Sequence, residues 1–467
     1  MGQVTYLTRN EDGIGIATGI LKQRFGDRLQ TGQAIREQHA HTTTWLELQA
    51  PDAVAFPETT DEVVEIVKVC AAHKVPLIPF GAGTSLEGHV NAPGGGISID
   101  FGRMNAVLEV NPEDLDCTVQ PGVTRKQLNT HLRDQGLFFP IDPGADASIG
   151  GMAATSASGT NAVRYGTMRD NVIAVQAVMA DGRVIKTASR AKKTSAGYDM
   201  TRLMVGSEGT LGVITEVTLK LHGIPEAMSS AVCSFPSVEA ACNAVIATIQ
   251  MGIPVARIEL LDALQVKACN AYSKLSLPEE PLLLLEFHGS TASVAEQAEV
   301  FGEIAEDTGG FGFTWTTEAE KRTELWQARH DAYWASLQLR PGAKGISTDV
   351  CVPISRLADC VTEAQAKLKE LDLVAPMVGH VGDGNFHTLL LIDMESDKEK
   401  AAADTFIDWL AERAIGMCGT CTGEHGIGQG KTDYLVKELG DAVMDMATIK
   451  RALDPDNILN PGKIFAL

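Results

Sequence analysis

Apolar residues recur at helical spacing from about residue 60 onward. The stretch Thr59-Thr60-Asp61-Glu62 has the form of a capping box, in which a hydroxyl and a later Glu satisfy the first amides of a helix. Apolar residues follow at Val63, Val64, Ile66, Val67 and Cys70. This spacing predicts a helix, and a buried strand from Val75 to Phe80 then runs directly into glycines. The polar stretch before it, residues 1–50, is helix-prone but has little pattern.

Further strands and a second capped helix are expected before residue 225. The helix opens at Thr124 and stops near Gly136, and Asp181-Gly182 is typical of a hairpin turn. The residues from Val213 to Leu221 alternate between two faces, so we expect a half-buried strand there. Shorter strands are expected at Ile97–Phe101, Val107–Val110 and Cys117–Gln120.

From about residue 226 strands and helices follow one another regularly. This order predicts a second domain, an antiparallel sheet backed by helices. Its strands are expected at Ser230–Phe235, Val255–Leu261, Leu282–His288 and Phe311–Thr316. Its helices are expected at Val238–Met251 and Ser293–Asp307, with one long helix from Glu318. The C-terminal part is again rich in glycine and is expected to return to the first domain.

Length and charge exclude several classes of protein. A chain of 467 residues has ample core for about two or three domains, and a net charge of −21 repels nucleic acid and anionic membrane surfaces. The 9 Cys are scattered, which indicates a reducing compartment rather than a disulfide scaffold. The sequence from Met1 to Tyr6 has no leader pattern, and no apolar run approaches the roughly 20 residues that span a bilayer. We therefore expect a cytoplasmic protein without a transmembrane segment.

Glycine is the feature of the composition that calls for explanation, with 45 residues gathered in a few stretches. The first stretch runs from Pro79 to Gly88 directly after a buried strand. Small residues and hydroxyls in such a turn expose several backbone amides, which is how a pyrophosphate is bound. It is not the dinucleotide fingerprint, because the third glycine of that motif would fall on Leu86. Alone, this stretch is as consistent with a tight turn as with a phosphate site.

Two more stretches of small residues favour a ligand site over a simple tight turn. One runs from Pro143 to Gly159 and the other from Gly206 to Ile214. Side chains this small cannot build a close-packed core without a bulky partner, so something large should pack against them. Together the three stretches favour a large, flat, phosphate-bearing cofactor over three unrelated turns.

Histidines and a glutamate gather in two further glycine-rich segments. His380 and His387 flank a Gly-Asp-Gly turn, which allows both rings to converge on one point. Glu424 and His425 lie among glycines further along the chain. Two His and one carboxylate suit Zn²⁺ or Mn²⁺ with positions left open for substrate. On these residues alone, a metal site and a set of hydrogen-bonded structural histidines are equally good interpretations.

With these motifs in place, the sequence resembles FAD flavoproteins of the vanillyl-alcohol-oxidase or PCMH type, specifically the FAD-linked D-lactate dehydrogenases of the cytochrome kind. The resemblance runs from about residue 40 to the end, through the segments 79–88, 143–171, 205–215, 379–387 and 420–431. It implies an α+β fold with a PCMH-type FAD-binding domain of two α+β subdomains at 1–225. It also implies a substrate-binding cap at 226–415 and a segment at 416–467 that returns to the FAD domain.

The resemblance also implies roles for individual residues. FAD is expected to be bound noncovalently, even though His89 lies in a turn where a covalent link can be imagined. His380, His387 and Glu424 are expected to hold the metal, with His425 as the base. The implied FAD-binding residues are Pro79, Gly81, Ala82, Gly83, Thr84 and Ser85 at the pyrophosphate, and Pro143, Gly144, Ser148, Gly151, Ser158, Gly159, Ile214 and Asn460 around the rest of the cofactor.

These residues are consistent with oxidation of a small D-2-hydroxy acid, such as D-lactate, to a 2-keto acid. The hydroxyl and one carboxylate oxygen can chelate a divalent ion, which lowers the hydroxyl pKa. His425 then takes the proton while hydride passes to flavin N5. Arg329 is the best candidate for the other carboxylate oxygen, since a guanidinium fork fits that geometry. The electron acceptor is expected to be a cytochrome c, a quinone or an electron-transfer flavoprotein, with the enzyme peripheral to a respiratory membrane, mitochondrial in a eukaryote.

Three alternatives remain. Within the same class the substrate could be 2-hydroxyglutarate or glycolate, although a dicarboxylate needs an extra cation that the segment Gly345–Asp349 does not offer. A flavin-free metallohydrolase could use the same His and Glu residues, but it leaves the small-residue stretches unexplained. An inactive binding module would not need a base beside metal ligands.

Overall fold

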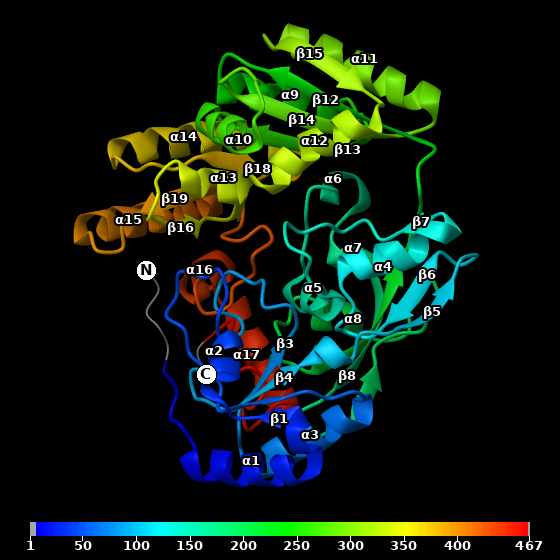
Figure 1. Ribbon diagram of the computed structural model, residues 1–467, viewed down its shortest axis with the longest axis vertical. Helices are drawn as coiled ribbons and strands as arrows, with labels where there is room; N and C mark the ends of the chain where they lie inside the picture. Colours follow the sequence, from blue (N-terminus) through cyan, green and yellow to red (C-terminus); the bar gives the residue numbers. More distant parts are fainter. Residues whose placement is uncertain (1–5, 466–467) are drawn as a thin grey trace. The chain divides into compact units, whose positions relative to one another are not determined.

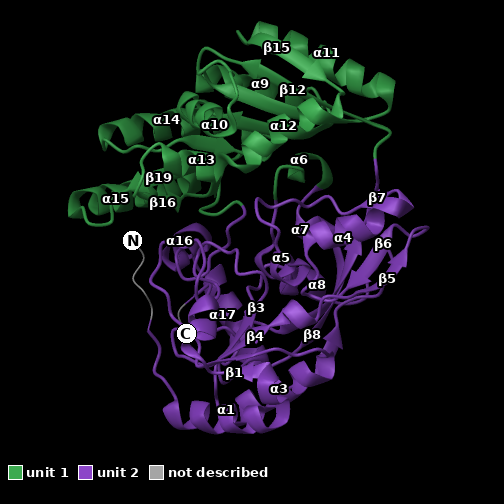
Figure 2. Ribbon diagram, viewed as in Figure 1, with its two compact units in different colours: residues 1, 159–165, 225–423 green, residues 2–158, 166–224, 424–467 purple. Residues whose placement is uncertain are grey.

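The computed structural model describes residues 6–465 and divides into two compact units (Figures 1 and 2). Unit 1 contains residues 159–165 and 225–423. Unit 2 contains the described residues before 159, residues 166–224 and those from 424 onward. Residues 1–5, on which the expectation about a leader segment rests, lie outside the described part. The units are defined by compactness and not by cofactor binding, so the expected division at residues 225 and 415 stays a prediction.

The first sheet of unit 2 has the strand order β1-β2-β4-β3. Strands β2, β4 and β3 are parallel, and β1 is antiparallel to β2. The helix α3 (Thr60–Ala72) begins after Thr59 as predicted, with the Thr59 side chain accepting a hydrogen bond from the Glu62 amide. The second bond of the expected capping box is not formed, because the Glu62 carboxylate accepts from the amide of Glu58 instead of Thr59. The strands are β1 (Leu29–Gln30), β2 (Ala53–Ala55), β3 (Leu77–Phe80) and β4 (Ile97–Asp100).

The polar stretch at residues 1–50 contains a helix that its sequence pattern only weakly predicts. Helix α1 (Glu11–Phe25) buries one face against the same core as α3. Its buried large residues, Ile14, Leu21 and Phe25, recur at helical spacing, but a run of glycine, charged and exposed apolar residues between them masks the period. Tertiary packing therefore stabilises a helix that local pattern alone only weakly indicates.

The second sheet of unit 2 is antiparallel, in the order β5-β6-β10-β8-β9. The expectation that its strand β10 is half buried was wrong. Val213 belongs to the core that includes α3, and Ile214 belongs to the core that includes α5 (Ile149–Thr155), so helices cover both faces. The strands are β5 (Val107–Asn111), β6 (Asp116–Val119), β8 (Val172–Val178), β9 (Val184–Lys186) and β10 (Val213–Lys220).

Unit 1 confirms the predicted antiparallel sheet backed by helices. Its strand order is β15-β12-β14-β13-β18-β19-β16, and every pair is antiparallel. Along β14 (Leu282–Gly289), Leu282 and Leu284 pack with Trp326 of α12 (Ala319–His330), whereas Phe287 contacts Phe301 of α11 (Thr291–Asp307), so helices cover both faces. The strands are β12 (Ala227–Ser234), β13 (Val255–Leu261), β14 (Leu282–Gly289), β15 (Phe311–Thr316), β16 (Lys344–Ser347), β18 (Met377–Gly379) and β19 (Asn385–Ile392).

Two helical features of unit 1 differ from the expectation. The long helix from Glu318 is two helices, which meet at Asp331, a residue type that favours helix ends over interiors. A further helix begins after Asp262, a cap that the sequence pattern did not reveal. The helices of unit 1 are α9 (Val238–Gln250), α10 (Ala263–Ser273), α11 (Thr291–Asp307), α12 (Ala319–His330), α13 (Ala332–Gln338), α14 (Leu357–Glu370) and α15 (Asp397–Gly416), with the short α6 (Ala162–Tyr165).

The Asp262 side chain links the start of α10 to the first residue of β18. Its carboxylate accepts hydrogen bonds from the amides of Gln265 at 2.8 Å and Met377 at 3.2 Å. Burial nevertheless raises the pKa of this carboxyl from 3.8 to about 6. The folded chain therefore retains a proton that the unfolded chain releases at lower pH, and stability falls as pH rises between these two values.

We predict that Asp262→Asn stabilises the protein above about pH 6 by roughly 1–3 kcal/mol, and that the gain disappears below about pH 4. The amide keeps an acceptor oxygen for both backbone bonds and removes the costly charge. Denaturant unfolding across this pH range measures the difference. Asp199→Asn is the matched control, since Asp199 also caps a helix but the hydrogen bond from the Arg202 amide lowers its pKa. A gain independent of pH would contradict the prediction.

Candidate functional site

The three small-residue stretches of unit 2 lie against one another. A Cβ added to Gly81 would overlap Oγ of Ser148, which joins the first stretch to the second. The amide of Gly206 donates a hydrogen bond of 2.9 Å to the carbonyl of Ala153, which joins the second to the third. Parts of the three stretches, including the predicted FAD residues Gly81 and Ser148, therefore lie together in unit 2, whereas Gly159 at the end of the second stretch belongs to unit 1.

Two hydroxyl groups in this region indicate a polar ligand. Oγ of Ser85 and Oγ of Ser207 are both buried and have no hydrogen-bond partner among the described residues. A buried hydroxyl without a partner is costly, so such groups are normally satisfied by protein, water or a ligand. Phosphate oxygens accept hydroxyl hydrogen bonds, so the residues present fit a pyrophosphate.

The remaining predicted FAD residues have diverse surroundings. The Ser148 side chain caps α5 by accepting from the amide of Gly151, and Ile214 is buried in the adjoining core. Asn460 donates to the carbonyl of Glu208 at 2.7 Å and so holds the C-terminal tail on the third stretch. Pro79 lies in β3 before the turn at 81–85, and Pro143 and Gly144 lie in the loop before α5. Ser158 follows α5, and Gly159 is the first residue of the 159–165 segment in unit 1.

In unit 1 the turn between His380 and His387 brings the two imidazoles together, as their spacing predicts. The ring centroids are 5.5 Å apart and the rings are nearly perpendicular. His380 follows β18. A short turn at Val381–Asp383 comes next and ends at Gly384, which has a φ of 81°. This turn reverses the chain into β19, which carries His387. Nitrogen atoms of the two rings lie close enough to share one metal ion.

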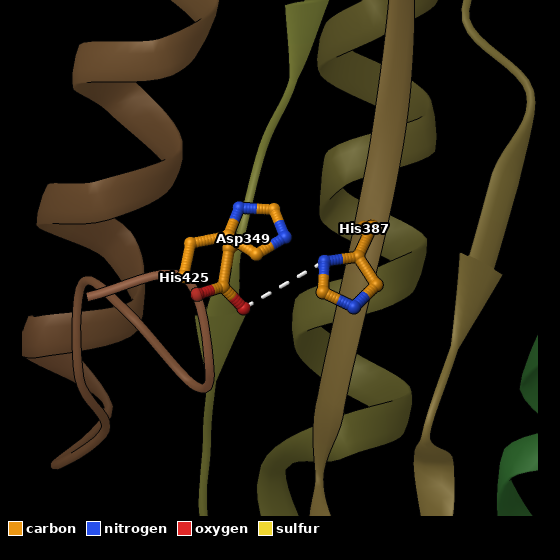
Figure 3. A group of neighbouring side chains, drawn as sticks. All are labelled: Asp349, His387 and His425. Carbon is orange, nitrogen blue, oxygen red and sulfur yellow. Dashed lines mark ion pairs between the residues drawn. The ribbon is translucent and has the colours of Figure 1, made fainter. Parts of the chain in front are cut away.

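In both imidazoles Nδ1 lies within hydrogen-bond distance of an oxygen atom, so Nε2 is the nitrogen left to bind a metal ion. Nδ1 of His380 lies 2.7 Å from Oε1 of Glu259, and Nδ1 of His387 lies 3.0 Å from the carbonyl of Thr348. Asp349 adds an ion pair to Nδ1 of His387 at 3.6 Å (Figure 3). Metal-binding histidines usually hold one ring nitrogen this way and ligate through the other, so Nε2 is the expected ligand of each.

Glu259 joins His380 to Arg329. Its other oxygen, Oε2, accepts from Nε of Arg329 at 2.8 Å and forms an ion pair with Nη2 at 2.7 Å, and the Glu259 side chain is 0% exposed. Burial alone would raise the pKa of this carboxyl, but the charges of His380 and Arg329 outweigh burial and the pKa is lowered. Sequence reasoning missed Glu259, although an acidic residue inside the apolar strand β13 is an unusual feature that could have revealed it.

The segment that carries Glu424 and His425 is anchored on both sides. Before it, Thr422 donates from Oγ1 to Asp349 at 2.7 Å within unit 1. After it, the amides of Ile427 and Gly428 donate to the carboxylate of a buried residue of unit 2, Glu208, at 2.7 and 2.9 Å. The residue before this segment is thus held within unit 1, and the residues after it are held within unit 2.

Two carboxylates of unit 2 are further residues that sequence reasoning missed. Glu208 holds the segment after His425 and lies 3.3 Å from Nε2 of His89. Glu87 places its carboxylate 3.8 Å from Nδ1 of His425 and 3.5 Å from Nζ of Lys431. Both glutamates lie inside glycine-rich stretches, where a lone buried acid among small residues was the available signal.

Comparison with known protein families defines the class of protein. The family described as FAD binding domain matches residues 51–188, and the family described as FAD linked oxidases, C-terminal domain, matches residues 224–464. The solved structure of p-cresol methylhydroxylase has a TM-score of 0.77 with 16% identity, over 99% of each chain. The predicted α+β fold of the PCMH type is confirmed, and the protein is an FAD-dependent oxidoreductase.

Individual relatives narrow the family. The chain is 51% identical to the probable mitochondrial D-lactate dehydrogenase of Danio rerio, over 94% of this chain and 89% of the relative. It is 48% identical to the mitochondrial D-lactate dehydrogenase [cytochrome] of Arabidopsis thaliana, over 89% of this chain and 73% of the relative. The chain belongs to the family of FAD-linked D-lactate dehydrogenases of the cytochrome type. None of the helices described is long and apolar enough to cross a membrane.

The approach of Gly81 to Ser148 gives a test of FAD binding. We predict that Gly81→Ala weakens FAD binding about tenfold or more, because the new methyl group must displace Ser148 and with it the turn at 81–85, where the pyrophosphate is expected. Titration of FAD into the stripped protein measures this. Gly223→Ala is the control, since a Cβ there meets no atom within 4 Å. Equal affinity of the Gly81 variant and the control would contradict the assignment.

Proposed function

We propose that the protein oxidises D-lactate, and similar small D-2-hydroxy acids, to the corresponding 2-keto acids. The observation that carries this proposal is the pair His380 and His387, converged on one point with each Nδ1 held by an acceptor, in a chain whose relatives are named D-lactate dehydrogenases. Bound FAD would supply the hydride acceptor of this reaction. All other roles fall to the residues of the chain.

We infer that His380, His387 and Glu424 hold a divalent ion, Zn²⁺ or Mn²⁺. Two imidazoles and a carboxylate suit these borderline ions, and the Nδ1 hydrogen bonds supply the outer support that metal-binding histidines require. The ion would bind the hydroxyl and one carboxylate oxygen of the substrate and favour loss of the hydroxyl proton. Glu424 directly follows Gly423, whose Cβ would overlap the Asn385 side chain in unit 1, so its backbone starts beside this region.

Two further residues complete the proposed chemistry. His425 is the proposed base for the hydroxyl proton, with the Glu87 carboxylate near its Nδ1 to orient the ring. Arg329 is proposed to bind the second carboxylate oxygen through Nη1, since its Nε and Nη2 bind Glu259. The segment 345–349 contains no cation, which favours a monocarboxylate with a small side chain over a dicarboxylate.

For the electron acceptor we propose a basic protein such as a cytochrome c. The net charge of −21 would attract such a partner and speed its encounter. The names of the relatives, which include "cytochrome" and "mitochondrial", are consistent with this acceptor and with a mitochondrial location in a eukaryote.

Anaerobic reduction of the bound flavin tests the reaction. We expect D-lactate to bleach the visible absorbance of the oxidised flavin and L-lactate to leave it unchanged. His425→Ala should keep FAD but slow bleaching by about a hundredfold or more, because the hydroxyl proton then lacks a base. His131→Ala, on the helix α4 (Arg125–Leu132), is the control. Bleaching by neither isomer would refute the proposed substrate, and full-speed bleaching in the His425 variant would refute the base.

Removal of the metal tests the ligand set. A chelator should suppress D-lactate oxidation while FAD stays bound, and Zn²⁺ or Mn²⁺ should restore the rate. His387→Ala should lose both the activity and the stoichiometric metal, as measured by elemental analysis of the dialysed protein. Turnover that is indifferent to chelation would refute the metal-assisted mechanism.

A further inference from the structure

The two carboxylate oxygens of Glu259 bind two different side chains, the imidazole of His380 and the guanidinium of Arg329. Oε1 faces Nδ1 of His380 at 2.7 Å, and Oε2 faces Nε and Nη2 of Arg329 at 2.8 and 2.7 Å. The side chain of Glu259 is 0% exposed, and those of His380 and Arg329 are 11% and 12% exposed. Competing water therefore has little access to these bonds.

The chemistry of the three groups fixes the direction of each hydrogen bond. A guanidinium only donates, so Oε2 must accept, and an ionised carboxylate only accepts, so Oε1 must accept as well. Nδ1 of His380 must then carry the hydrogen. In the neutral imidazole this leaves the lone pair on Nε2, the tautomer that a metal ion requires at that atom.

We infer that Glu259 is a positioning residue that sets the tautomer of His380 and aims Arg329, and so joins the metal site to the cation proposed for the substrate carboxylate. This inference rests on the proposed function, because it gives Glu259 a purpose only where His380 holds a metal. No catalytic role is assigned to Glu259 itself, since it contacts neither the substrate nor the cofactor in the proposed arrangement.

The substitution Glu259→Gln separates this role from simple packing. The amide has the same shape but one oxygen and one NH₂ group. Arg329 can only donate, so the oxygen faces Arg329 and the NH₂ faces Nδ1 of His380. Nδ1 must then accept, and the hydrogen moves to Nε2, where it blocks the metal.

A matched control lies in the same sheet. Glu286 of β14 is also a buried carboxylate beside a histidine and an arginine, with Oε1 at 2.7 Å from Nε2 of His288 and 3.6 Å from Nε of Arg257. Glu286→Gln therefore makes the same chemical change in a similar network that does not include His380. A general effect of an uncharged buried amide would appear equally in both variants.

The experiment titrates Zn²⁺ and Mn²⁺ separately into metal-stripped, FAD-loaded wild type, Glu259→Gln and Glu286→Gln, with calorimetry as the readout. We expect the Glu259 variant to bind about 10 to 100 times more weakly and the Glu286 variant to match wild type within about twofold. Metal affinity of the Glu259 variant equal to wild type, or an equal loss in both variants, would overturn the inference. Absence of binding by wild type would instead overturn the proposed metal site.

A second measurement needs no variant of Glu259. ¹⁵N NMR of metal-free wild type labelled at histidine, with His380 assigned by its loss in His380→Gln, reports which ring nitrogen carries the hydrogen. We expect Nδ1 to be protonated at neutral pH. A neutral His380 with its hydrogen on Nε2 would overturn the inference even if the Glu259 variant does not fold.

Discussion

Buried carboxylates that accept hydrogen bonds from fixed donors are the interaction on which the candidate site depends. Glu259 accepts from His380 and Arg329 in unit 1, and Glu208 accepts from the amides of Ile427 and Gly428 in unit 2. A carboxylate is costly to bury unless donors surround it. Each glutamate therefore strongly favours one arrangement of its partners. The His380 ring and the backbone at 427–428 are held in a defined position in this way.

In the C-terminal tail the buried charged groups are lysines, and they donate hydrogen bonds to fixed backbone acceptors. Lys450 is buried and donates to the carbonyls of Thr210 and Leu459 at 2.8 and 2.9 Å, with an ion pair to Asp454. Lys463 donates to the carbonyl of Asn91 at 2.8 Å, and burial lowers its pKa to about 7. These two lysine side chains tie the tail to the chain near residues 91 and 210.

Sequence reasoning predicted the periodic parts of the fold and missed what depends on long-range partners. The helix start at Thr59 and the four strands expected in unit 1 were correct because one segment carries the whole signal. The paired histidines were brought together by their own turn. Glu259 and Glu208 were missed because their partners lie far along the chain: an apolar strand or a glycine-rich stretch around a glutamate indicates that it is buried, but it does not indicate which residues bind it.

The charges of unit 1 favour a divalent ion in the proposed site. Surface charge acts weakly on a buried anion, since salt screens it within about 8–10 Å, so the net charge of −21 does not decide substrate binding. Arg329 is the local cation, but Glu259 neutralises it at 2.7 Å, and a metal-binding imidazole is neutral. This set therefore carries no net positive charge of its own. An anionic 2-hydroxy acid would then owe its attraction to the ion, while Arg329, aimed by Glu259, would contribute direction.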